Sequence, residues 1–282
     1  VIPEQQECIM GTDKLRVHVK NNHASPKTFP PTKEGEVVFT ITEERFQAAC
    51  DKYPDIARQI EVFIDWGLDR FSESMQTAGV LVAWDLPTED LARVAPNLQW
   101  IHIIGAGVEH LWPMDWLPDD VTMVNNRGTH AAKGGEFGLM SILMLHSRLP
   151  AIIGNQKTAT WSSLFSGSVS GKTVVVIGVG HIGTSVARRC KALGLNVIGI
   201  SRHGRPVSGV DGVLTPKNLD SVLPAADFVV LAVPLTTETR NLFDLRRQAL
   251  TKPGAGIVNI GRAATMDYQA LVGNLQSGHF SG

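Results

Sequence analysis

The most constraining feature of this chain is a β-branched run that leads directly into a glycine-rich turn. Thr173–Ile177 reads TVVVI, which is typical of a buried parallel strand. Residues 178–183 follow the pattern GxGxxG and open an amphipathic helix, and a second apolar run covers residues 196–201. A strand, a turn, a helix and a strand in this order predict a dinucleotide site, with the pyrophosphate at the N-terminus of the helix.

Each glycine of this turn has its own expected task. Gly178 allows the tight turn, and Gly180 lets the backbone approach a pyrophosphate without a Cβ atom in the way. Gly183 lets the helix pack closely on the preceding strand. The first N–H groups of the helix then face the anion, together with the positive end of the helix dipole.

The end of the second strand indicates which dinucleotide is preferred. A carboxylate about 20 residues beyond the turn would accept hydrogen bonds from the ribose 2′-hydroxyl of NAD. Ser201 and Arg202 occupy this place, Arg205 is close by, and the segment holds no carboxylate. A hydroxyl and a guanidinium can bind a 2′-phosphate, whereas a carboxylate would repel it. The sequence therefore favours NADP as the cofactor, and NAD is also possible. The other interpretation of Arg202 and Arg205 is that they are solvated loop charges with no role in binding.

Strand-like and helix-like runs alternate along the chain, which predicts two α/β domains with parallel sheets. Helices are expected at residues 43–59, with Thr42 as N-cap, and at 89–94. A long apolar-periodic stretch within residues 128–148, closed by Pro150, is expected to join the domains. We expect the domains to cover residues 1–128 and 129–282. The expected strands are residues 15–19, 37–41, 79–83, 100–104 and 121–124 in the first, and 173–177, 196–201, 228–233 and 256–260 in the second.

Composition restricts the class of partner. The 26 Lys and Arg residues nearly balance the 27 Asp and Glu residues, which is not typical of nucleic-acid binding. Cys8, Cys50 and Cys190 follow no disulfide or metal-ligand spacing and indicate reduced thiols in the cytoplasm. No apolar run has membrane-spanning length, and no signal-peptide pattern opens the chain, so we expect no membrane partner.

Five motifs occur in order between Trp100 and Gly282. They are IIGAGVEHL at 103–111, AAKGGEFGL at 131–139, SGKTVVVIGVGHIG at 170–183, VVLAVPLTTET at 229–239 and GIVNIGRAATMD at 256–267. Together they resemble the D-isomer-specific 2-hydroxyacid dehydrogenases, which include D-lactate, phosphoglycerate, glyoxylate and hydroxypyruvate oxidoreductases. The resemblance implies a flavodoxin-like substrate domain, a Rossmann-type dinucleotide-binding domain and a homodimer.

The resemblance also implies roles for particular residues. Arg262, after the strand at 256–260, would bind and polarise the 2-oxo acid while a hydride arrives from the nicotinamide. The backbone N–H groups of Ala106, Gly107 and Val108 would hold the substrate carboxylate, and Gly105 and Gly107 would permit its close approach. Cofactor contacts are implied for the N–H groups of His181 and Ile182 at the pyrophosphate, for Val233 and Pro234 along the nicotinamide ribose, and for Thr239, Ile260 and Gly261.

Two positions depart from the usual family pattern. Ala263 follows Arg262 where glycine is usual, and Ser201 and Arg202 replace the common acidic position. The second departure favours the NADP-linked glyoxylate and hydroxypyruvate reductases. The catalytic histidine and its partner glutamate would follow Gly282, so the chain is expected to be an incomplete record of a longer enzyme. His279 is expected to be a solvated loop histidine.

The leading hypothesis is NADPH-dependent reduction of a small 2-oxo acid, similar to glyoxylate or hydroxypyruvate, to the D-2-hydroxy acid. Such a site needs a hydride donor, an anion clamp and a proton donor, and the first two are visible in the sequence. The alternatives are a dinucleotide-sensing, corepressor-like interaction protein on the same fold, and a formate or phosphite dehydrogenase.

Overall fold

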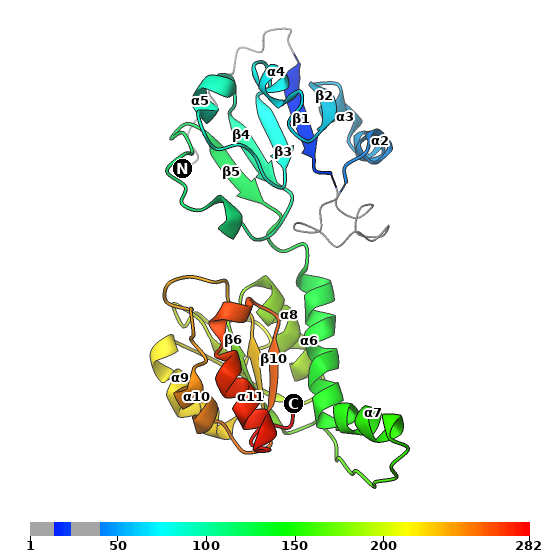
Figure 1. Ribbon diagram of the computed structural model, residues 1–282, viewed down its shortest axis with the longest axis vertical. Coiled ribbons are helices and arrows are strands. Elements are labelled where there is room, and N and C mark those ends of the chain that lie inside the picture. The colour runs from blue at the N-terminus through cyan, green and yellow to red at the C-terminus, as the bar shows by residue number, and fades with distance from the viewer. Residues whose placement is uncertain (1–13, 24–39) are drawn as a thin grey trace. The chain divides into compact units, whose positions relative to one another are not determined.

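A computed structural model of the chain describes residues 14–23 and 40–282 (Figure 1). The strand expected at residues 37–41 lies outside the described residues, apart from Thr40 and Ile41, which are not in a strand. The chain divides into two compact units, with the division between Asn126 and Arg127.

The first unit contains a five-stranded parallel sheet in the order β2-β1-β3-β4-β5. Its strands are β1 (Leu15–Asn21), β2 (Ile60–Trp66), β3 (Val80–Ala83), β4 (Trp100–Ile103) and β5 (Thr122–Asn125). This strand order is the flavodoxin-like one, which confirms the expected fold class for this unit. The carboxyl ends of β1, β3, β4 and β5 therefore lie next to one another at one edge of the sheet.

The segment after Thr42 differs from its prediction. Thr42 accepts a hydrogen bond from the N–H of Arg45 at 3.2 Å, which confirms it as the N-cap of α2 (Glu43–Lys52). Pro54 then interrupts the expected helix, because proline has no N–H and restricts the residue before it. A short helix, α3 (Pro54–Ala57), follows, and the chain enters β2. No strand was expected at residues 60–66, although the β-branched and aromatic residues of IEVFIDW were a signal for one.

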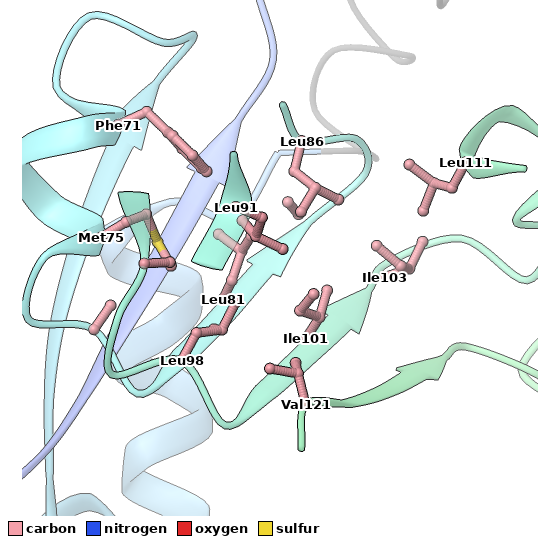
Figure 2. Packing of buried hydrophobic residues seen from close by; sticks show 13 residues of the cluster. Phe71, Met75, Leu81, Leu86, Leu91, Leu98, Ile101, Ile103, Leu111 and Val121 are labelled. Carbon is pink, nitrogen blue, oxygen red and sulfur yellow. The ribbon is translucent and has the colours of Figure 1, made fainter. Parts of the chain in front are cut away.

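Two short helices cover the core of the first unit. These are α4 (Phe71–Met75) and α5 (Leu91–Val94). Figure 2 shows Phe71, Met75 and Leu91 beside Leu81 of β3 and Ile101 of β4, and all five side chains are buried. This packing buries one face of β3 and β4.

The second unit contains another five-stranded parallel sheet, in the order β10-β9-β6-β7-β8. Its strands are β6 (Thr173–Ile177), β7 (Asn196–Ile200), β8 (Gly212–Leu214), β9 (Phe228–Leu231) and β10 (Gly256–Asn259). The chain runs outward from β6 to β8 and then returns to the other side of β6. This is the Rossmann-type arrangement, and its topological switch point, where ligands bind in open α/β sheets, lies between β6 and β9.

Helices cover both faces of the second sheet (Figure 1). On one face lie α6 (Ala131–His146) and α8 (His181–Ala192). On the other lie α9 (Leu219–Val222), α10 (Leu245–Leu250) and α11 (Tyr268–Gln276). The strands alternate between the faces: Val174 and Val176 point toward α8, while Val175 and Ile177 pack with Leu219 of α9.

Two glycines of the motif AAKGGEFGL let α6 approach α8 closely. A Cβ atom on Gly135 would lie 2.3 Å from Oγ of Ser185, and one on Gly138 would lie 2.6 Å from Cγ2 of Val186. Pro150 does not close the expected helix, because α6 ends at His146. Instead, Pro150 lies in the first turn of α7 (Leu149–Lys157), where its missing N–H needs no partner.

In the described ranges, no single helix is long and apolar enough to cross a membrane. Only α6 and α7 together reach the required length and composition, and they are bent by 65° at the break between them.

His18 of β1 is a fully buried titratable residue of the first unit. Its ring stacks on Phe63 with centroids 5.0 Å apart, and its Nδ1 atom lies 3.2 Å from Sδ of Met75. Burial lowers the pKa of His18 to about 4, although the negative charge of Asp65, 3.4 Å from Nε2, acts in the opposite direction. The imidazole is therefore neutral in the folded protein at neutral pH, and its contact with Asp65 is not an ion pair.

This burial predicts that the first unit is sensitive to acid. Between pH 6.5, the ordinary pKa of histidine, and about 4, the unfolded chain binds a proton that the folded chain does not. The contribution of His18 to the free energy of unfolding is therefore complete above pH 6.5 and is lost as the pH falls to about 4, on the order of 3 kcal/mol in total. Urea denaturation at several pH values should show a weaker pH dependence for His18→Gln. Identical profiles for the two proteins would contradict the assignment.

Candidate functional site

The glycine turn between β6 and α8 has an open approach from solvent. Gly178 has φ +99°, and a Cβ atom there would lie 2.7 Å from the carbonyl oxygen of Ala232. A Cβ atom on Gly183 would lie 1.9 Å from the carbonyl oxygen of Gly178, so only glycine lets the helix pack this closely. Around Gly180 the corresponding space is empty to 4 Å. A phosphate group could therefore approach the backbone at Gly180, and the turn fits a dinucleotide.

The N-terminus of α8 faces this open space. Gly180 is the N-cap residue, and no side chain caps it within the part of the chain that the structure describes. The first hydrogen bond of the helix runs from the N–H of Thr184 to the carbonyl oxygen of Gly180, at 2.9 Å. The preceding N–H groups, those of His181, Ile182 and Gly183, are available to an anion.

Ser201, Arg202 and Arg205 follow β7, the neighbour of β6. The N–H of Ser201 donates to the carbonyl oxygen of Leu214 at 2.9 Å, and its Oγ accepts from the N–H of Gly204 at 3.1 Å. The hydroxyl is thereby held at the end of the strand with its own hydrogen still to donate. The side chains of Arg202 and Arg205 are exposed.

A carboxylate near Arg202 was missed by sequence reasoning. The hydroxyl of Thr236 donates a hydrogen bond to Glu238 at 2.7 Å, and this bond holds the pKa of Glu238 below its usual value. The positive charge of Arg202 acts on the pKa of Glu238 in the same direction. Because Glu238 comes 36 positions after Arg202 in the chain, their proximity depends on the sheet order and is not a local sequence signal.

Val233, Pro234, Ile260 and Gly261 follow the adjacent strands β9 and β10. A Cβ atom on Gly261 would lie 2.7 Å from the carbonyl oxygen of Val233, so these two strand ends are in close contact. The hydroxyl of Thr239 donates to the carbonyl oxygen of Pro234 at 2.7 Å and accepts from the N–H of Thr236 at 2.7 Å. Thr239 therefore closes the turn after β9 and holds Pro234 in position.

Arg262 lies at the carboxyl end of β10 with its backbone fixed and its side chain exposed. Its carbonyl oxygen accepts hydrogen bonds from the hydroxyl of Thr265 at 2.7 Å and from Nδ2 of Asn259 at 3.3 Å. Asn259 also accepts from the N–H of Gly261 at 3.0 Å. Asn259 thus supports both residues from within the NxxR run, a role that sequence reasoning did not assign to it.

In the first unit, the loop after β4 has three successive carbonyl groups bound by asparagines and three successive N–H groups open. The carbonyl oxygens of Ile104 and Gly105 accept hydrogen bonds from Asn126 at 2.7 and 3.0 Å, and that of Ala106 accepts from Nδ2 of Asn125 at 2.8 Å. Within the described residues, the N–H groups of Ala106, Gly107 and Val108 donate to no protein acceptor. Three successive free N–H groups suit an anion such as a carboxylate. Asn125 and Asn126 were also missed, although they directly follow the predicted strand at 121–124.

Gly105 and His279 differ from what the sequence predicts. Gly105 is buried, and the space beside it is filled by Trp84 of this chain, so this glycine does not leave room for a ligand. His279 is half-buried and not a solvated loop residue: its Nε2 lies 3.2 Å from the carbonyl oxygen of Gln248. The backbone carbonyl oxygen of His279 accepts a hydrogen bond from the N–H of Gly254, just before β10 begins. His279 therefore lies at the start of this strand, whereas Arg262 follows its end.

Comparison with known proteins identifies the family. Residues 139–282, about half of the chain, match the family model described as D-isomer specific 2-hydroxyacid dehydrogenase, NAD binding domain. The chain belongs to this family. Its second unit, with the glycine turn and the switch point, is accordingly the nicotinamide dinucleotide-binding domain.

Relatives within the family carry different names. D-3-phosphoglycerate dehydrogenase of Mycobacterium tuberculosis is 31% identical over 215 residues, which are 75% of this chain and 41% of that protein. Glyoxylate reductase of Thermococcus gammatolerans is 41% identical over 129 residues, 45% of this chain and 39% of that protein. The chain thus spans about two fifths of the length of these relatives.

A solved structure shares the fold over nearly the whole chain. It is an NADPH-dependent glyoxylate/hydroxypyruvate reductase from Sinorhizobium meliloti, in complex with NADP and sulfate. The two sequences are 26% identical and the structures match with a TM-score of 0.72. The match covers 95% of this chain and 79% of the reductase chain.

Proposed function

We propose that the protein uses NADPH to reduce a small 2-oxo acid, such as glyoxylate or hydroxypyruvate, to the D-2-hydroxy acid. The observation that carries this proposal is the placement of two exposed arginines at one edge of the second sheet. Arg262 follows β10 and Arg202 follows β7, on opposite sides of the glycine turn after β6. A dinucleotide across the switch point would then have one arginine near each end.

We assign the cofactor roles to residues at the carboxyl ends of the strands in the second sheet. We assign the pyrophosphate to the N–H groups of His181 and Ile182, and the adenosine 2′-phosphate to Ser201, Arg202 and Arg205. Val233, Pro234, Ile260 and Gly261 would line the nicotinamide end, and Thr239 contributes by holding Pro234. When bound, NADPH supplies the hydride.

The substrate roles use groups that are already oriented. We assign the substrate carboxylate to the N–H groups of Ala106, Gly107 and Val108, which makes residues 1–128 the substrate domain and 129–282 the cofactor domain. Arg262 would hold the 2-oxo group, because a guanidinium stays charged while negative charge builds on the carbonyl oxygen. Hydrogen bonds from Asn259 and Thr265 fix the backbone of Arg262, which restricts where its side chain can reach.

Charges near the loop support a substrate without a second anionic group. Lys20, at the end of β1, is buried and donates to Asp85 at 2.6 Å and to Asn22 at 2.5 Å. Burial raises the pKa of Asp85, but the hydrogen bonds from Lys20 and Asn22 outweigh it and hold this pKa below its usual value. Lys20 is thus neutralised by an ionised Asp85. This pair does not favour a phosphate-bearing substrate such as the 3-phosphoglycerate in the name of the mycobacterial relative.

A substrate panel tests the proposal. At saturating NADPH, the native protein should have a kcat/KM for glyoxylate or hydroxypyruvate at least about tenfold above that for 3-phosphohydroxypyruvate, since Lys20 is already paired with Asp85. A preference for the phosphorylated acid would contradict the substrate class. Absence of turnover with all three acids would contradict the activity itself.

The remaining assignments, a cytoplasmic homodimer without nucleic-acid or membrane partners, are also part of this proposal. Both described cysteines, Cys50 and Cys190, are free thiols. Burial raises the pKa of Cys190 to about 12, so this thiol is unreactive at neutral pH. The near balance of 26 basic and 27 acidic residues supports the absence of a nucleic-acid partner.

A further inference from the structure

The indole ring of Trp84 fills the place that a side chain at position 105 would take. Trp84 follows β3, and Gly105 opens the loop after the neighbouring strand β4. A Cβ atom on Gly105 would lie 2.0 Å from Cζ3 and 2.7 Å from Cε3 of Trp84. Gly105 is not among the residues with a positive φ, so its backbone alone does not require glycine. Glycine is required at this position because the indole ring of Trp84 leaves no room for a Cβ atom.

His110 holds the same tryptophan from the other end of the loop. It lies in the 3-10 helix Glu109–Leu111, directly after Val108. The rings of Trp84 and His110 stack with centroids 4.6 Å apart and an interplanar angle of 9°. Nε2 of His110 lies 2.8 Å from the carbonyl oxygen of Trp84, where an N–H of the imidazole can donate to it. Both ends of the loop therefore rest on one residue.

Hydrogen bonds from Asn125 and Asn126 hold the opposite side of the loop. Asn125 and Asn126 bind the carbonyl oxygens of Ile104, Gly105 and Ala106, which directs those oxygens toward β5. With Gly105 pressed against the indole and its carbonyl held by Asn126, the following peptide groups have little freedom to turn. The N–H groups of residues 106–108 are then oriented before an anion arrives, which lowers the cost of binding it.

We propose that Trp84 is a positioning residue for the anion-binding loop, residues 105–108. It acts through Gly105 and His110 and need not touch the substrate. The identity of the anion, a 2-oxo acid carboxylate, rests on the proposed function. The support that Trp84 gives to the loop is independent of the proposed function.

Exchange rates of single amides test the support without using activity. The N–H of Asn126 donates to Gly105 and the N–H of Leu111 donates to Val108, so both bonds report on the loop. In Trp84→Leu, hydrogen exchange of these two amides, followed by NMR, should be faster by at least about tenfold. Trp100→Leu is the matched control, because Trp100 is exposed and begins β4 at the other end of the strand. It should leave both rates unchanged.

Kinetics separate positioning from general destabilisation. Trp84→Leu should raise KM for glyoxylate by at least about tenfold, with a smaller change in kcat and an unchanged Kd for NADPH. Trp84→Phe should recover part of the loss, because a smaller ring can still stack on His110.

A second test combines Gly105→Ala with Trp84→Leu. Gly105→Ala should raise KM strongly in the wild-type background and by less than about twofold in Trp84→Leu, where the clash is absent.

The outcomes distinguish this inference from the proposed function. Unchanged exchange of Asn126 and Leu111 in Trp84→Leu, or an equal effect of Gly105→Ala in both backgrounds, would overturn the role of Trp84. If the wild-type protein reduces no 2-oxo acid, the proposed function is wrong, and the exchange rates still decide whether Trp84 supports the loop.

Discussion

Replacing Arg262 by glutamine is expected to lower kcat/KM for glyoxylate by at least about 100-fold, the scale of losing one transition-state charge stabiliser. Glutamine keeps a donor but loses the permanent charge that would face the carbonyl oxygen as the hydride arrives. The backbone should be unaffected, because Thr265 and Asn259 bind the carbonyl oxygen of Arg262 and not its side chain. Steady-state kinetics and an NADPH titration, which should stay near wild type, provide the measurement.

Two further variants sharpen this test. Arg262→Lys should restore only part of the activity, because a point charge cannot hold a carboxylate and a carbonyl oxygen as the guanidinium fork does. Arg246→Gln is the matched control: Arg246 is an exposed arginine of the same unit, and it pairs with Asp220 on α9. Full turnover in Arg262→Gln would show that the role of this residue is assigned wrongly.

Arg202→Ala is expected to weaken NADPH binding by about 1.5 to 3 kcal/mol, the range for a hydrogen bond to a charged group, and to leave NADH binding nearly unchanged. The loss should be smaller at high ionic strength, because the side chain is exposed. Calorimetric titration of both cofactors at one fixed salt concentration measures the difference.

Glu238→Gln is the complementary variant. It removes a negative charge that acts on Arg202, so it should strengthen NADPH binding modestly, in the opposite direction to Arg202→Ala. Equal losses of NADPH and NADH affinity in Arg202→Ala would indicate that this arginine supports the turn and does not read the 2′-phosphate.

Local patterns predicted the parts of the fold that depend on few residues. The strand at 173–177 and the glycine turn after it could be read directly, because β-branched residues and glycines at fixed spacing determine that geometry over about ten positions. The helix expected at residues 43–59 ran through Pro54, which interrupts it. β2, which begins just after that range, was missed because IEVFIDW alternates only in part, and β8 was missed because three residues carry little periodicity.

The supports of the candidate site were harder to predict because they join distant segments. Trp84 meets Gly105 only because β3 and β4 are neighbours in the sheet, and Glu238 comes near Arg202 only because β9 returns beside β6. A glycine in a loop indicates that space or backbone freedom is needed there, and not which neighbour takes the space. The expectation that Gly105 makes room for a ligand failed for this reason.

Calorimetric titration of the native protein with NADPH and with NADH tests dinucleotide binding and its selectivity together. The glycine turn after β6 should bind a nicotinamide dinucleotide, and Ser201 and Arg202 should select its 2′-phosphate. NADPH is expected to bind at least about tenfold more tightly than NADH, which corresponds to about 1.4 kcal/mol. Equal or tighter binding of NADH, or no binding of either dinucleotide, would contradict it.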